Sequence, residues 1–170
     1  DSPGFFAMFW NSVAITAGIL LGQCVFAVQA AWALAKLRLP RGLGNLYMVL
    51  MLLPFQVLMY PEYLVLRSLG LLDTLWAVIL PGIFSAYPVF LLTRFFAAIP
   101  EEILEAARLD GAGEWQIFFH IALPMGLPGL LSVGILSFLD AWNLIEQPMT
   151  FLKSRALWPL SLFLPVTTLA

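Results

Sequence analysis

Of the 170 residues, 62% are hydrophobic and only 11% are charged, and the mean hydropathy is +0.95. A soluble domain carries about 25% charged residues because water must solvate its surface, so this composition excludes an ordinary soluble domain and predicts a membrane protein. The net charge of −2 provides no basic surface for phosphates, which argues against nucleic-acid binding. The single cysteine, Cys24, has no partner for a disulfide, and we interpret it as a packing residue.

Charged residues occur in clusters, and four uncharged segments separate them. Each uncharged segment has at least 20 residues, and about 20 apolar residues in a helix cross the roughly 30 Å hydrocarbon layer of a bilayer. We therefore predict four transmembrane helices, near residues 11–35, 46–60, 75–95 and 127–142. A further apolar stretch begins at Leu157, and residues 157–170 are predicted to start another span.

These spans predict an all-α membrane protein: a polytopic transmembrane helix bundle, with about four complete spans plus the start of a fifth, in which residues 1–170 form one domain. Prolines fall inside the predicted spans at Pro54, Pro81, Pro88 and Pro128. A helix in water would not tolerate them well. Within a bundle, neighbouring helices and local adjustments satisfy the backbone groups that proline leaves free.

The positions of lysine and arginine predict the orientation, because short cytoplasmic loops are enriched in both residues. The connections after the first and third spans carry five of them, at Lys36, Arg38, Arg41, Arg94 and Arg108. The opposite side has three, at Arg67, Lys153 and Arg155. This bias predicts that residues 36–42 and the segment 100–124 lie in the cytoplasm.

The segment 100–124 is polar and has two parts. Pro100 fits the first position of a helix, and the carboxylates that follow it complement the helix dipole. The Asp110-Gly111 pair is predicted to end this helix near Leu109, since glycine readily adopts the left-handed conformation. A second short helix is expected around residues 114–120, leading to Pro124 and the next span. The prediction is a helix–turn–helix outside the bilayer.

Side-chain size indicates what this element can do. Small residues around the turn would let another protein approach the backbone closely, and four apolar residues could anchor it in a partner's groove: Leu104, Leu109, Trp115 and Phe118. Physical reasoning alone leaves an alternative open, in which the two helices lie on the membrane and pack only for their own stability.

The stretch EAARLDGAGEWQIFFHIALP resembles the cytoplasmic loop signature of binding-protein-dependent ABC importer permeases, through Glu105, Ala106, Ala107, Gly111, Ile121, Leu123 and Pro124. Segments such as LLPFQVLMYPEYLVLRSLGLLDT and FLDAWN resemble the carbohydrate branch of this family, specifically its maltose-type second permease subunit, over nearly the whole chain. The resemblance implies the core of a type I ABC importer permease. It also implies that residues 100–124 form a coupling loop seated in a cytoplasmic ATPase, through Glu105, Ala106, Ala107, Asp110, Gly111 and Ala112.

The same resemblance implies the partners and the location. These are a cytoplasmic ABC ATPase dimer, a homologous second permease and an extracytoplasmic solute-binding protein, in the cytoplasmic (inner) membrane of a bacterium or archaeon. The chain is expected to be non-catalytic and to bind no cofactor, with ATP and Mg²⁺ held by the ATPase, and it contains no glycine-rich phosphate-binding motif. Such permeases usually have six spans, so the chain is interpreted as a fragment without the first span and the end of the sixth.

Five residues are candidates for the substrate path: Gln56, Asp140, Trp142, Asn143 and Glu146. Ionisable groups near membrane depth are costly, which suggests that Asp140 faces a cavity. Asn143 and Glu146 continue its face, Trp142 adjoins it, and Gln56 at mid-span could bond a sugar hydroxyl. The alternatives are solvation of Asp140 and Glu146 at the outer interface and a helix–helix hydrogen bond for Gln56. The lone His120 is expected to cap the membrane interface rather than bind a metal.

Three functions remain possible at this level. The favoured one is import of a sugar or oligosaccharide. The second is import of a non-sugar solute, such as a polyamine or phosphate, by the same architecture. The third is a membrane protein without a transport role, in which the loop merely packs.

Overall fold

The structure is a computed structural model that describes residues 3–163, and this part of the chain contains helices and no strand. The α-helices are α1 (Pro3–Lys36), α2 (Gly42–Met51), α3 (Phe55–Ser68), α4 (Trp76–Ile83), α5 (Ala86–Ala97), α6 (Glu101–Leu109), α7 (Glu114–Ile117), α8 (Leu123–Trp142) and α9 (Glu146–Phe151). A π-helical turn, η1 (Phe118–Ala122), joins α7 to α8, and the 3₁₀ turns η2 (Arg155–Leu157) and η3 (Leu160–Leu162) follow α9. The predicted all-α class is confirmed.

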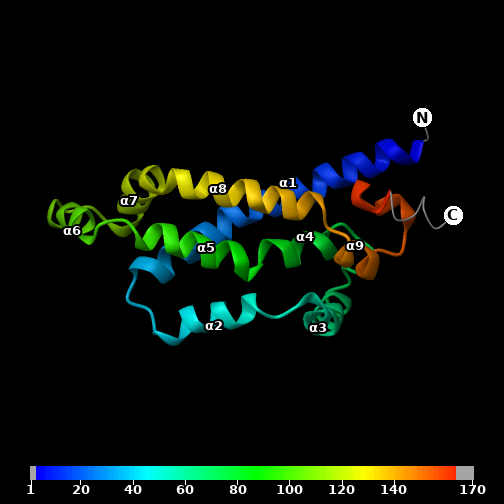
Figure 1. Cartoon of the computed structure of the whole chain (residues 1–170), viewed down its shortest axis with the longest axis horizontal. Coiled ribbons are helices and arrows are strands. Elements are labelled where there is room, and N and C mark those ends of the chain that lie inside the picture. The colour runs from blue at the N-terminus through cyan, green and yellow to red at the C-terminus, as the bar shows by residue number, and fades with distance from the viewer. Residues whose placement is uncertain (1–2, 164–170) are drawn as a thin grey trace.

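The long helices run side by side along an elongated molecule (Figure 1). Helix α1 packs against α4, α5 and α8, and α2 packs against α5. Helices α6 and α7 lie at one end, whereas α3, α9 and both chain termini lie at the other. The chain therefore has two distinct ends, which we name the α6 end and the α9 end.

Three helical segments are long and apolar enough to cross a membrane: Gly4–Lys36, Trp76–Ala97 and Glu114–Trp142. They contain the predicted segments 11–35, 75–95 and 127–142. The expected separate helix at 114–120 differs from the structure, because α7 continues through η1 into α8 without a loop. Pro124 falls in the first turn of α8, where its missing N–H is tolerated, and the π-helical turn before it absorbs the change in hydrogen bonding.

The predicted span at 46–60 is present as two helices that together are apolar enough to enter a membrane, as a broken span or a re-entrant loop, and not as one continuous helix. Helix α2 ends at Met51, α3 begins at Phe55, and the two are bent by 104°. Pro54 is the cause: it has extended backbone angles, it lacks an N–H, and it disfavours a helical conformation in the residue before it. The ten residues of α2 are about 15 Å long, roughly half the hydrocarbon thickness. In Figure 1, α2 follows the long axis and α3 is seen end on.

The stretch expected to begin another span at Leu157 forms two short 3₁₀ turns in its described part, and residues 164–170 lie outside the described residues. These turns pack against the beginning of α1. Asn11 Nδ2 donates to the carbonyl of Ala156 at 2.7 Å, and the amide of Leu160 donates to Ser12 Oγ at 2.7 Å. The turns therefore close the α9 end of the bundle.

Glycine permits the close approach of α1 and α4. A Cβ added at Gly82 would lie 2.6 Å from Ile19 Cδ1, and one at Gly22 would overlap Ile83. Beside this contact, Gln23 Nε2 donates to the carbonyl of Gly82 at 2.9 Å. Small residues and an interhelical hydrogen bond are the means by which membrane helices associate. This packing fixes the wall of the central cavity described below.

Candidate functional site

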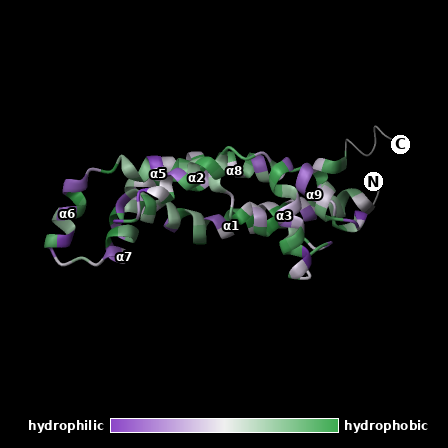
Figure 2. Cartoon of the chain, turned by 90° about the horizontal axis from the view of Figure 1, so that it is seen from below, coloured by the Kyte–Doolittle hydropathy of each residue, from purple (hydrophilic) through white to green (hydrophobic). Residues whose placement is uncertain are grey.

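Helices α6 and α7 project beyond the other helices at the α6 end (Figure 2). A tight turn closes α6: the amide of Gly111 donates to the Arg108 carbonyl at 3.0 Å, and the amide of Ala112 donates to the Ala107 carbonyl at 3.0 Å. This pair of bonds defines a Schellman motif, in which the residue after the C-cap is left-handed. Gly111 has a φ of +86°, which glycine adopts at little cost. The predicted break at Asp110-Gly111 is confirmed.

Four charged side chains join this helix pair to the bundle. Lys36 Nζ lies 2.6 Å from the Ile99 carbonyl and 3.2 Å from Glu101 Oε2. Arg108 bonds Glu101 Oε1 through Nη1 at 3.1 Å and Glu114 Oε1 through Nε at 2.9 Å. Helices α1, α6 and α7 are thereby tied together. The basic connection 36–42, which follows α1, and the segment 100–124 lie at the same end of the molecule, as the charge pattern predicts.

These contacts also shift the pKa values of the groups involved. The hydrogen bond from Arg108, followed by that from Lys36, holds the pKa of Glu101 below its usual range. The hydrogen bonds to Glu114 and then Glu101 raise the pKa of Arg108. Both effects favour the charged forms of Glu101 and Arg108, and so stabilise the ion pair between them.

The four apolar residues expected to face a partner divide into two pairs. Leu104 and Phe118 are buried in the chain's own core, 0% and 2% exposed, and Phe118 packs near Trp32 with ring centroids 6.0 Å apart. Their prediction as partner anchors is wrong, because they fix α6 and η1 to the bundle instead. Leu109 and Trp115 remain 89% and 64% exposed. Only this second pair is available to a partner.

The outer surface of the turn consists of small and acidic residues. Glu105, Ala106, Asp110 and Gly111 are exposed, and Ala107 and Ala112 are half-buried. No side chain would meet a Cβ at Gly111 within 4 Å. Beside the turn lies a hollow of about 450 Å³, lined by Asp110, Gly111, Ala112, Gln116, Ile117, His120 and Ile121. His120 Nδ1 is 3.0 Å from the Gln116 carbonyl. The arrangement can accept a protruding segment of another protein.

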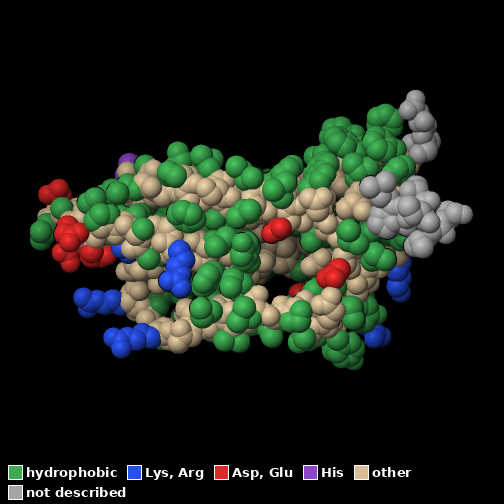
Figure 3. Space-filling model, viewed as in Figure 1, with side chains coloured by type: hydrophobic (Ala, Val, Ile, Leu, Met, Phe, Trp, Pro, Cys, Tyr) green, Lys and Arg blue, Asp and Glu red, His purple; other side chains and the backbone are tan. Residues whose placement is uncertain are grey.

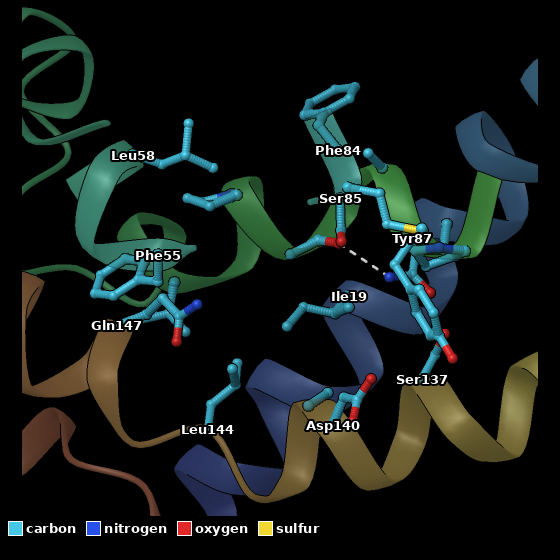
Figure 4. Close-up of a pocket in the computed structure, with 18 of the residues that line it drawn as sticks. Ile19, Phe55, Leu58, Phe84, Ser85, Tyr87, Ser137, Asp140, Leu144 and Gln147 are labelled. Carbon is cyan, nitrogen blue, oxygen red and sulfur yellow. Dashed lines mark hydrogen bonds between the residues drawn. The ribbon is translucent and has the colours of Figure 1, made fainter. Parts of the chain in front are cut away.

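A second candidate site is a cavity of about 430 Å³ near the middle of the bundle, which we name the central cavity. Figure 4 shows Asp140 and Ser137 of α8 on one side of the cavity, with Tyr87 of α5 next to Ser137. Phe55 and Leu58 of α3 lie on the opposite side. Of the five candidate path residues, Asp140 alone lines this cavity in the described part of the chain. Asp140 thus lines a cavity, and its role in a substrate path stays a prediction.

The other four candidate path residues lie elsewhere. Gln56 Nε2 donates to Glu146 Oε1 at 3.0 Å, which joins α3 to α9 as a helix–helix hydrogen bond. Trp142 stacks on Phe138, with ring centroids 5.8 Å apart and planes inclined by 19°. Asn143 Nδ2 donates to the Leu139 carbonyl at 2.8 Å. The expected continuous polar face is absent because α8 ends at Trp142, so that residues 143–146 leave its helical register.

Sequence reasoning missed most of the polar lining of the central cavity: Gln23, Glu62, Ser85, Tyr87, Ser137 and Gln147. Glu62 was not predicted to line a cavity, because a straight second span near 46–60 would place it beyond the end of the helix. The bend at Pro54 instead turns α3 so that Glu62 lines the cavity. Gln23 carried a usable signal, since a polar residue inside a long apolar run is expected to face other helices.

Comparison with known proteins agrees with this architecture. Residues 14–151 match the family described as "Binding-protein-dependent transport system inner membrane component". The chain belongs to this family, and it is a multi-pass membrane protein.

Individual relatives cover almost all of the chain. It is 32% identical over 169 residues to protein LplC of Bacillus subtilis, covering 99% of this chain and 57% of that protein. It is 33% identical over 158 residues to the arabinooligosaccharide transport permease AraQ of Halalkalibacterium halodurans, covering 92% of this chain and 57% of the relative. The chain thus spans little more than half the length of these relatives.

A solved structure has the same fold. It is the crystal structure of a bacterial ABC transporter involved in the import of the acidic polysaccharide alginate, with a TM-score of 0.88 and 28% sequence identity. The match covers 98% of this chain and 60% of the solved chain.

Proposed function

We propose that the chain is a permease subunit of an ATP-driven, binding-protein-dependent ABC importer, most simply one for a sugar or oligosaccharide. One observation carries the proposal: the exposed turn between α6 and α7 is joined to the bundle on two sides. On one side α7 runs through η1 into α8, and on the other Lys36 of α1 holds Glu101 of α6. A force applied at the turn would reach both long helices.

The mechanism follows from this rigid connection. A cytoplasmic ATPase grips Glu105, Ala106, Ala107, Asp110, Gly111 and Ala112, and ATP binding moves the turn together with the attached helices. Alternating exposure of the central cavity then needs two arrangements of the bundle with different affinities for the partners. In this proposal ATP and Mg²⁺ belong to the ATPase, and this chain acts mechanically without catalysis.

The proposed partners are two ATPase subunits, a homologous second permease and an extracytoplasmic solute-binding protein. The proposed location is the cytoplasmic membrane, with the α6 end inside the cell. The distribution of basic residues supports that orientation, because Lys36, Arg38, Arg41, Arg94 and Arg108 belong to the connections at this end.

Two lines of support favour a sugar as the solute. The names of relatives include transport permeases for arabinooligosaccharides and for polygalacturonan or rhamnogalacturonan. The central cavity combines apolar walls with amide, hydroxyl and carboxylate groups, a composition suited to a polar ligand without negative charge. Another relative is named as a permease for sn-glycerol-3-phosphate. In the described part of this chain, however, no Lys or Arg lines the central cavity, so no cation there would pair with a phosphate.

The proposal is tested with the full-length subunit in its assembled transporter. Ala106→Trp places a large side chain on the exposed face of α6 without changing the glycine turn. We expect the ATPase to be lost on purification and ATP-driven uptake to fall by about tenfold or more, because a bulky group blocks close approach. Ala156→Trp, at an exposed position of the α9 end, is the control and retains the ATPase. Retention of the ATPase and full uptake in Ala106→Trp would reject the docking role.

A further inference from the structure

The central cavity carries two carboxylates from opposite parts of the chain. Glu62 comes from α3 and Asp140 from α8, and both belong to its lining. The bend at Pro54 brings α3 to this cavity, so the pairing depends on the tertiary fold and not on sequence proximity.

Neither carboxylate is neutralised within the described part of the chain. No ion pair involves Glu62 or Asp140 in residues 3–163. The Oε2 atom of Glu62 is buried and has no hydrogen-bond donor among these residues. A buried acceptor without a donor is destabilising, and more so when it is charged. A ligand that supplies donors would recover this cost.

The surrounding groups add acceptors rather than positive charge. One amide N–H of Gln23 donates to the Gly82 carbonyl at 2.9 Å, so its carbonyl oxygen and its second N–H remain for a ligand. Among the described residues, no Lys, Arg or His lines the cavity. Figure 3 shows basic side chains towards the two ends of the visible face, and acidic side chains also near its middle.

From this juxtaposition we propose that the central cavity selects solutes by charge: it accepts glycosides rich in hydroxyl or amino donors and rejects anionic ones, such as uronates and sugar phosphates. The inference rests on the proposed transport function and deepens it. Hydroxyl and ammonium groups donate to Glu62 and Asp140, whereas a ligand carboxylate would be repelled by both and would find no cation in exchange.

The test uses three probes with one backbone: β-1,4-linked trimers of glucose, glucosamine and glucuronic acid. Binding of each is measured by equilibrium dialysis to the purified assembled transporter without its solute-binding protein, at neutral pH. The expected order of affinity is glucosamine, then glucose, then glucuronate. The affinities of the two charged trimers should differ by about a hundredfold. Relative to the glucose trimer, attraction should raise the affinity of the glucosamine trimer about tenfold, and repulsion should lower that of the glucuronate trimer about tenfold.

Variants assign this order to the two carboxylates. The double variant Glu62→Gln, Asp140→Asn keeps the size of both side chains and should bring the three affinities to within about threefold of each other. Glu146→Gln removes a carboxylate that bonds Gln56 instead of lining the cavity, and it should keep the wild-type order.

Two outcomes would overturn the charge selection. One is equal binding of the glucuronate and glucosamine trimers to the unmodified complex, and the other is an unchanged order in the double variant. ATPase retention is measured on the same preparations. Absence of charge preference in the unmodified complex with its ATPase still bound rejects this inference alone, whereas failure of the unmodified subunit to hold an ATPase rejects the proposed function.

Discussion

Lys36, the last residue of α1, holds Glu101, the first residue of α6, with Nζ and Oε2 separated by 3.2 Å. The lysine side chain is only 7% exposed, whereas that of Glu101 is 48% exposed. Lys36 also donates to the Ile99 carbonyl at 2.6 Å. This residue therefore connects the longest described helix to the segment that the ATPase moves in the proposed mechanism.

The first prediction concerns this connection. Lys36→Met removes the charge and the three hydrogen bonds of the ammonium group, to the carbonyls of Ala97 and Ile99 and to Glu101, while keeping the apolar stem. We expect a small loss of stability, about 1 kcal/mol or less, because one partner is solvent-exposed. Uptake per ATP hydrolysed should fall several-fold, since α6 would move without α1.

The measurement is the ratio of transported solute to phosphate released by transporters in vesicles. Arg38→Met is the matched control, because Arg38 is exposed and follows Lys36 in the same connection. An unchanged ratio in Lys36→Met would show that α1 is not coupled through this contact.

The second prediction tests the turn itself. Gly111 has a φ of +86°, and a Cβ there would meet no other side chain. Gly111→Ala should therefore destabilise through backbone conformation alone, by about 1–2 kcal/mol. Gly44→Ala, inside α2 and also surrounded by open space, should be neutral or slightly stabilising. Thermal unfolding of the purified subunit compares the two, and an equal effect at both positions would contradict the assigned turn.

The third prediction is a pH dependence at the α9 end. Asp73 Oδ1 accepts from the amides of Lys153 and Ser154 at 2.8 and 2.7 Å, and Oδ2 accepts from Ser154 Oγ at 2.6 Å. The hydroxyl of Ser154 is the main cause that lowers the pKa of Asp73. A lowered pKa in the folded state contributes stability above the ordinary value, about 3.9, and this stability is lost as the pH falls through the lower folded value.

Accordingly, wild type should unfold at a higher temperature than Asp73→Asn at neutral pH, and the difference should vanish on acidification below the usual aspartate range. Glu102→Gln is the control for loss of a surface charge, because it removes another exposed carboxylate, for which the described residues contain no ion pair. A difference for Asp73→Asn that persists at low pH would show that the contact does not depend on ionisation.

Local chemistry predicted much of this molecule. Uncharged segments predicted three of the apolar helical segments, and Asp110-Gly111 predicted the turn. The distribution of basic residues predicted that Lys36 and Glu101 lie at the same end of the molecule. These features depend on composition and on backbone preference, which are local properties.

Tertiary packing decided the remainder. Prolines at 61, 81 and 128 lie inside helices, whereas Pro54 breaks one, so the residue type alone did not locate the bend. Leu104 and Leu109 belong to the same helix, yet one is 0% and the other 89% exposed. Which apolar residue faces the core and which acid lines the cavity follows from neighbours distant in sequence.

The position of Ala106 gives the most direct test of the coupling account. In a Cys24→Ser background, which removes the single native cysteine, Ala106→Cys is exposed to a membrane-impermeant maleimide in oriented vesicles. We predict labelling only from the cytoplasmic side, and protection when the ATPase is bound. Ala156→Cys, at the opposite end, should label from the other side. Labelling of Ala106→Cys from outside, or equal labelling with and without the ATPase, would contradict the account.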